Sequence, residues 1–302
     1  MRKQSFYMTI ITALLFCACN KREIFSPNRY IETEKLQTGA SSLELVKQFT
    51  YAKKNQLTSV WLKDNNTTLT FEYNKDKTVK QINSSEMNNT CYAQLFYENK
   101  LVTHIHYYEN NLLVRESVFS RKGKKNTINK IENYVYNGFS SKEAGTLSLL
   151  LFPETKNMPE TVLKQHKNGE KELYAVLDVT YENDNISRVR LFYMANGVST
   201  LHSTTTYTYD NKQNPYYGLP YAFMQLTGYN KNNEVYARTS YENDRYKTMI
   251  TIESTYLYEK KYPTDKSVTE SETSAVSFDA NGAPKDWATS SKYSSSQYTY
   301  IK

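Results

Sequence analysis

Leu69-Thr70-Phe71-Glu72-Tyr73-Asn74-Lys75-Asp76 is the stretch that decides the fold class. Its apolar residues alternate with polar ones, and side chains two positions apart fall on the same face of a β-strand. The run then reaches a tyrosine followed by short polar residues that favour a turn. A strand that has one solvent-exposed face and is followed by a turn indicates antiparallel β structure.

The same phrase, a β-rich run with a tyrosine and a few polar turn residues, recurs along the chain. Further copies begin at Tyr97, Tyr108, Tyr181, Tyr209, Tyr229 and Tyr241. Their spacing suits one strand or one hairpin per step. Asn-Gly pairs add a second turn signal, because type I′ hairpin turns need two residues with positive φ. These pairs begin at Asn137, Asn168, Asn196 and Asn281.

These patterns predict an all-β fold: a long antiparallel up-and-down meander of on the order of fifteen strands, curled or barrel-like, with one or two short helices. Residues 142–152 indicate a short helix or a buried strand. Residues 214–220 are rich in proline and, with 221–226, indicate a loop with a helical turn. Charged and amide side chains near the strand middles of 47–54 and 67–77 favour a sheet that faces water over a membrane pore.

The first residues have the features of an export signal that ends at a lipidation site. Arg2 and Lys3 are positive, residues 8–16 form a short apolar run, and Ala18 precedes Cys19. A run this short cannot cross a bilayer, which needs ~20 apolar residues. The pattern resembles a bacterial lipobox, which implies cleavage after Ala18 and a lipid on the Cys19 sulfur. The alternative is a secreted protein whose signal happens to end in cysteine.

The chain therefore divides into three predicted parts. Residues 1–18 are a signal peptide, and residues 19–45 are a lipid-anchored tether without clear periodicity. Residues 46–302 form one antiparallel β-meander domain, since all-β domains often reach this length. With Cys17 removed and Cys19 lipidated, Cys91 has no cysteine partner, and we expect a buried thiol there.

Composition and motifs exclude several classes of function. The net charge is +7 for the 302 residues, and its cations are interspersed with acids, which argues against nucleic-acid binding. The sequence has no glycine-rich phosphate loop, no Gly-x-Ser-x-Gly elbow and no Cys-x-x-Cys or His-Glu-x-x-His pair. We assign no catalytic, cofactor or metal residue.

One histidine pair leaves a question open. In His104-Ile105-His106 both imidazoles would lie on one face of a strand. They could hold zinc if His166, His202 or Glu109 joined them. The alternative is that both lie on the polar face, opposite Ile105 and Tyr107.

The lipobox, the tyrosine-led turns and the phrase Tyr207-Thr208-Tyr209-Asp210-Asn211-Lys212-Gln213-Asn214-Pro215-Tyr216-Tyr217-Gly218-Leu219 resemble a known group. They are similar to uncharacterised Bacteroidetes lipoproteins that carry a domain of unknown function with a porin-like β fold. The general character of the sequence resembles this group over roughly residues 45–302. It implies a lipid-anchored protein of the bacterial outer membrane, on either its periplasmic or its cell-surface side, and it supplies no catalytic residue.

Aromatic content gives the remaining functional signal. The chain has 28 Tyr, 12 Phe and 2 Trp, and such rings both favour strands and form contact surfaces for ligands. We expect a non-enzymatic envelope lipoprotein that binds a glycan, a peptide or a partner protein. The alternatives are a structural or assembly component of the outer membrane and, third, an uncharacterised hydrolase. A contiguous exposed patch of tyrosines would favour binding.

Overall fold

The computed structural model describes residues 30–53, 56–63, 66–85, 90–123, 126–136, 171–195, 197–219, 230–243, 248–258, 265–278 and 284–301. These ranges contain sixteen strands and no helix. Residues 142–152, predicted as a short helix or a buried strand, and residues 221–226 of the predicted loop lie outside them, as do the signal peptide and Cys19. The strands are β1 (Ile31–Thr38), β2 (Glu44–Ala52), β3 (Gln56–Leu62), β4 (Thr67–Tyr73), β5 (Val79–Ser84), β6 (Cys91–Glu98), β7 (Leu101–Glu109), β8 (Leu112–Lys122), β9 (Thr127–Val135), β10 (Glu172–Glu182), β11 (Asn185–Ala195), β12 (Val198–Gln213), β13 (Asn232–Asn243), β14 (Thr248–Tyr258), β15 (Asp265–Phe278) and β16 (Pro284–Tyr300).

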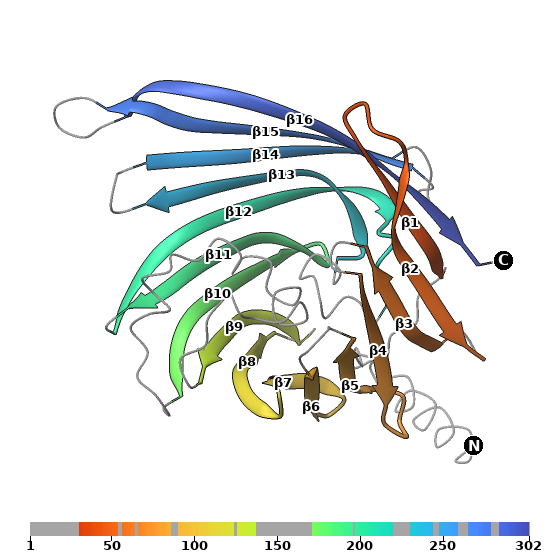
Figure 1. Cartoon of the computed structure of the whole chain (residues 1–302). Helices are drawn as coiled ribbons and strands as arrows, with labels where there is room; N and C mark the ends of the chain where they lie inside the picture. The colour runs from red at the N-terminus through yellow and green to blue at the C-terminus, as the bar shows by residue number, and fades with distance from the viewer. Residues whose placement is uncertain are drawn as a thin grey trace, which may run out of the picture.

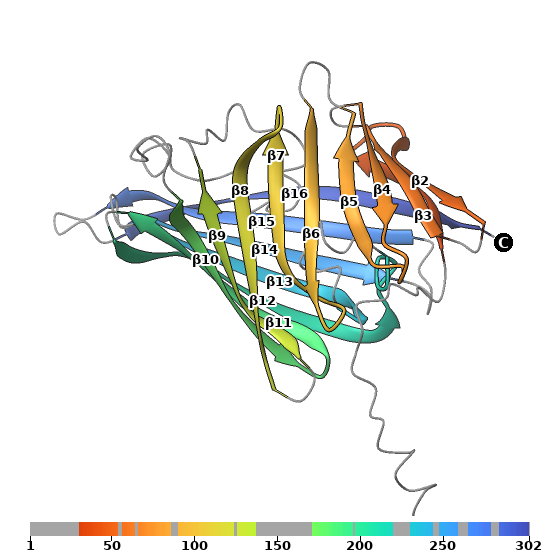
Figure 2. The same ribbon diagram turned by 90° about the horizontal axis from the view of Figure 1, so that it is seen from below.

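Each strand pairs antiparallel with its neighbours in sequence, which confirms the predicted up-and-down meander. The sheet closes into a barrel where β1 pairs with β16, from Ile31 opposite Tyr300 to Thr38 opposite Ser294. Figure 1 shows the strands curving around a common interior, with β12–β16 facing β3–β9 across it. Figure 2 shows β5–β10 side by side along one wall.

Asparagine-led turns join many of the strands. Asn99 and Lys100 both have positive φ, of 50° and 66°, and link β6 to β7 in a two-residue hairpin. Asn110-Asn111 and Asn183-Asp184 make the same kind of turn. Asparagine and aspartate tolerate this left-handed backbone better than most residues, so the tyrosine-led phrases can turn without glycine.

The apolar positions face the barrel interior, as the alternation predicts. In β4, Leu69 and Phe71 are buried while Thr70 and Glu72 are exposed. Buried apolar residues of β1–β7 and β9–β11 form a single hydrophobic cluster with Leu219 and Tyr298. Because strands from opposite walls share this cluster, its side chains must point inward. We call this the inner face and the opposite side the outer face.

Bulges recur where odd-numbered strands begin. Thr50 of β2 pairs with Ser59 but Tyr51 pairs with Leu57, so Leu57-Thr58 of β3 stands opposite a single position of β2. The Thr58 hydroxyl donates to the Thr50 carbonyl at 3.0 Å. A bulge interrupts the regular ladder, so its polar groups need other partners. Equivalent register shifts occur at Val79-Lys80, Val102-Thr103, Ile128-Asn129 and Ile186-Ser187.

Long side chains that point inward near the ends of even-numbered strands donate hydrogen bonds to carbonyl groups where the preceding strands begin. The Tyr73 hydroxyl of β4 donates to the carbonyl of Leu57, the first bulge residue of β3, at 2.6 Å. Burial raises the pKa of that hydroxyl, as expected for a phenol held against the core. We call these contacts the rim staples. The others are Tyr51 to Ile31 (2.8 Å), Tyr97 to Val79 (2.7 Å), Tyr209 to Ile186 (2.7 Å) and the Arg121 guanidinium to Val102 (3.3 Å).

Strand β1 corrects the predicted tether of residues 19–45. Ile31–Thr38 is a strand that closes the barrel, so the β domain begins near Ile31 rather than at residue 46. A register shift between Ile31 and Thr33 leaves Glu32 as an extra residue of β1 in the pairing with β16. The buried residues Ile31 and Glu34 are therefore three positions apart, and the two-residue period of a regular strand is lost.

The phrase Tyr207–Leu219 runs from β12 into a turn that reaches the barrel seam. The side-chain oxygen of Asn214 accepts a hydrogen bond from the backbone N–H of Tyr216 at 3.0 Å. This contact orients Tyr216. The Tyr216 hydroxyl donates to the Glu34 carboxylate and accepts from Lys47 at 3.1 Å. Burial alone would raise the pKa of Glu34, but the Lys47 charge and these hydrogen bonds outweigh burial and lower it. One loop thus contacts both β1 and β2.

We predict that Tyr97→Phe lowers the free energy of unfolding by ~1–2 kcal/mol, because the Val79 carbonyl loses its staple while the ring still packs. Urea unfolding of the wild type and the variant measures the change, as a shift of the denaturation midpoint at an unchanged m-value. Tyr217→Phe is the matched control, since within the described part of the chain its hydroxyl has no hydrogen-bond partner. Equal losses in the two variants would contradict a specific role for the staple.

Candidate functional site

Aromatic rings gather on the outer face of β6 and β7. Cys91, Ala93 and Leu95 of β6 are buried inward, so the intervening Tyr92, Gln94 and Phe96 point outward. Tyr92 stacks on Tyr108 of β7 with ring centroids 4.7 Å apart and planes inclined by 13°. Phe96 lies 4.5 Å from the His106 ring and is 41% exposed.

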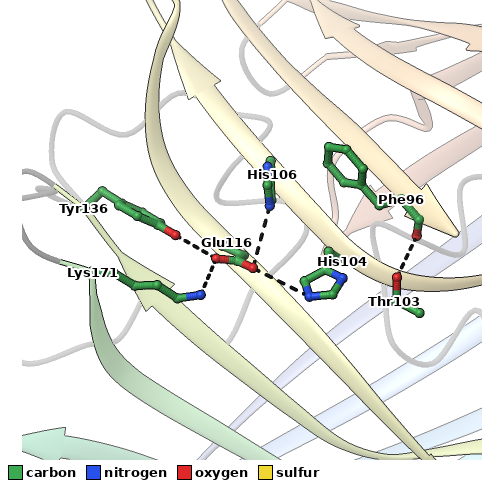
Figure 3. Close-up of polar contacts among 7 residues, drawn as sticks. All are labelled: Phe96, Thr103, His104, His106, Glu116, Tyr136 and Lys171. Carbon is green, nitrogen blue, oxygen red and sulfur yellow. Dashed lines mark hydrogen bonds and ion pairs between the residues drawn. The ribbon is translucent and has the colours of Figure 1, made fainter. Parts of the chain in front are cut away.

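Glu116 of β8 lies beside these rings. It stands opposite His106 on β7 and opposite Tyr134 on β9. Its Oε2 accepts a hydrogen bond from the Tyr136 hydroxyl at 2.7 Å and pairs with the Lys171 ammonium at 2.7 Å. Its Oε1 faces the Nε2 atoms of His106 and His104, at 3.6 and 3.8 Å (Figure 3).

This crowding buries a carboxylate on the outer face. The Glu116 side chain is only 6% exposed. Burial alone would raise its pKa, but the hydrogen bonds from Lys171 and Tyr136 and the Lys171 charge outweigh burial and lower the pKa. Glu116 is therefore ionised at neutral pH, and its charge is balanced by Lys171.

The surroundings of His106 shift the pKa of its imidazole. Burial lowers its pKa below the usual 6.5, and the nearby Glu116 only partly opposes that effect. The imidazole is therefore neutral at pH 7. Lys171, which begins the described segment before β10, also lies 4.2 Å from the centre of the Tyr134 ring, a cation–π distance.

An amide network continues the site across β4–β6. Gln94 donates to Gln81 at 3.3 Å, Gln81 donates to Asn83 at 2.6 Å, and Asn83 donates to Glu72 at 3.0 Å. All four side chains lie on the outer face, and Gln94 stands opposite His106. The rings of β6 and β7 are thus continuous with a set of hydrogen-bonding groups.

The structure places both predicted histidines on the outer face, opposite the buried Ile105 and Tyr107. Neither Glu109 nor His202 joins them, and His202 instead contacts the rings of Tyr193 and Tyr241. His166 lies outside the described residues. Within the described ranges, no three or more His, Cys, Asp or Glu side chains are arranged to hold a metal ion.

One further sequence prediction can be compared with the structure, and one residue of the site was not predicted. Cys91 is a free, buried thiol on the inner face, as expected. Glu116 was not singled out by any sequence motif. Its partners come from β7, β9 and the segment before β10, and only the cross-strand register brings them together.

Comparison with protein-family models and with curated proteins finds no match to this chain. The resemblance to Bacteroidetes lipoproteins therefore remains an expectation. In the described part of the chain, no helix is both long and apolar enough to span a membrane.

We predict that Glu116→Gln lowers the pKa of His106 further, because the variant removes the negative charge that partly offsets its burial. An NMR titration of the imidazole signals measures the shift. Glu72→Gln, which alters an exposed carboxylate on β4, is the control and should leave the His106 titration unchanged. A His106 pKa that stays constant or rises in Glu116→Gln would refute this account.

Proposed function

We propose that this protein is a non-enzymatic, lipid-anchored module of the bacterial outer membrane that binds a glycan on the outer face of β6–β9. The observation that carries the proposal is the contiguous set of rings from Tyr92, Tyr108 and Phe96 beside the His106–Glu116 pair. A rigid ring offers a large apolar contact area, and a tyrosine tip adds a hydrogen bond. Sugars present both kinds of surface, an apolar ring face and polar hydroxyls.

The amide side chains beside the rings support a glycan over a purely apolar ligand. Gln81, Asn83 and Gln94 hold one another in place, and each amide offers both donors and acceptors. Groups already ordered before binding lose little conformational entropy when the ligand arrives. The surface therefore suits a ligand with many hydroxyls.

The state of Glu116 supports binding rather than acid–base catalysis. A general acid needs a pKa near the working pH, whereas Lys171 and Tyr136 hold the pKa of Glu116 low. Its Oε2 is already engaged by both groups. The carboxylate acts as a fixed acceptor that orients its neighbours.

The proposed anchor keeps the barrel close to the membrane. The chain between Cys19 and Ile31, the first residue of β1, could span at most ~40 Å even if fully extended. A diacylglyceryl cysteine with a further acyl chain would hold the protein almost permanently. The ligand would then be a glycan present in the layer next to the membrane.

Phe96→Ala should weaken glycan binding by ~5-fold or more, because loss of an aromatic anchor costs ~1 kcal/mol or more. A glycan array with the purified full chain identifies the ligand, and isothermal titration measures the variant. Val198→Ala is the control, since Val198 is an exposed apolar residue on a different part of the barrel. Capture of peptides or proteins with no glycan signal would overturn the proposal.

The anchor has its own test. Cys19→Ala should abolish metabolic labelling with an acyl-chain probe and release the barrel from the membrane fraction. Cys17→Ala should keep both labelling and membrane attachment. Continued acyl labelling of Cys19→Ala would refute the assignment of the lipid to this residue.

A further inference from the structure

A continuous row of outer-face side chains crosses six strands of the barrel wall. Each member stands directly opposite the next in the strand register, so the row runs perpendicular to the strands. We call it the polar stripe. Its members, from β4 to β9, are Glu72, Gln81, Gln94, His106, Glu116 and Tyr134.

The length of the polar stripe favours a polymer. Neighbouring strands lie ~4.8 Å apart, so five steps from Glu72 to Tyr134 cover ~24 Å. One or two sugar units would contact only part of that length. The antiparallel ladder fixes the spacing, so the polar groups recur at a constant interval across the wall.

Rings flank the polar stripe on both sides. Along β6, Gln94 of the stripe stands between Tyr92 and Phe96, two residues away in each direction. Along β7, His106 stands between Tyr108 and His104. A ligand lying on the stripe would therefore meet hydrogen-bonding groups beneath it and ring edges or faces beside it.

The charge of the polar stripe selects against acidic sugars. Its acidic members are Glu72 and Glu116, and the Lys171 ammonium is already paired with the Glu116 carboxylate. Among the described residues, no member of the stripe is a lysine or an arginine. A uronate or sulfate group lying on the stripe would meet two carboxylates and no cationic member of the stripe to balance its charge.

We propose that the polar stripe is the binding track for an internal segment of a linear, neutral polysaccharide laid across the strands. This inference rests on the proposed glycan-binding function and adds the direction, length and charge of the ligand. Affinity should rise at least ~10-fold from disaccharide to hexasaccharide and then level off, as successive units fill the stripe.

The test is isothermal titration of the full lipidated chain in a detergent without sugar head groups. The probes are neutral gluco-, manno- and chito-oligosaccharides of increasing length, together with oligogalacturonate as the acidic comparison. Gln81→Ala should weaken hexasaccharide binding several-fold and leave disaccharide binding within twofold. Thr180→Ala, on the outer face of β10, is the control variant. Thermal unfolding verifies that both variants keep the fold.

The outcomes separate this inference from the proposed function. Binding that depends on Phe96 but is equally tight for short and long oligosaccharides overturns the track and leaves the glycan-binding proposal intact. Tighter binding of oligogalacturonate overturns the assignment of a neutral ligand. No binding of any saccharide, in titration or on the array, overturns both proposals.

Discussion

The rim staples are the interaction on which the rest of this structure depends. In each of them, a long side chain near the end of an even-numbered strand donates to a carbonyl where the preceding odd-numbered strand begins, as Tyr97 does to Val79. Even-numbered strands all run in the same direction in an antiparallel meander, so the staples lie at one rim of the barrel. They engage the bulges, which are the places where the sheet ladder is otherwise interrupted.

The staples matter because register decides which face each side chain occupies. A slip of one residue between two strands would move the inward apolar set to the outside. A staple joins a particular side chain to a particular carbonyl, so it opposes such a slip. The polar stripe on the outer wall depends on the same constraint, since Gln94, His106 and Glu116 line up only when β6, β7 and β8 keep their observed pairing.

Much of the fold could be predicted from local sequence patterns. The alternation in Leu69–Tyr73 and the tyrosine-led turns depend on neighbouring residues, and both appear in the structure as expected. Strand β1 could not be recognised, because the bulge at Glu32 removes the two-residue period on which such predictions rest. Arg121 departs from the tyrosine pattern, because its guanidinium takes the place that tyrosine has in the other staples.

The candidate site was less predictable for a physical reason. His104 and His106 are two residues apart in one strand, so their shared face follows from the sequence alone. Glu116 reaches them only through pairing between strands, and Lys171 comes from a segment far along the chain. Register is a property of whole strand pairs, and no short motif encodes it.

Two buried glutamates show how the barrel uses the same chemistry on its two faces. Glu34 at the seam and Glu116 on the outer face each have a lysine and a tyrosine hydroxyl as partners. In both cases these partners outweigh burial and lower the carboxyl pKa. The Glu34 set fastens a loop to β1 and β2. The Glu116 set ties the chain before β10 to β8, beside rings that remain partly exposed. The difference between the structural role of Glu34 and the binding role proposed for the Glu116 site then lies in the surroundings. An inward carboxylate is enclosed by the core, whereas an outward one leaves neighbouring groups within reach of a ligand.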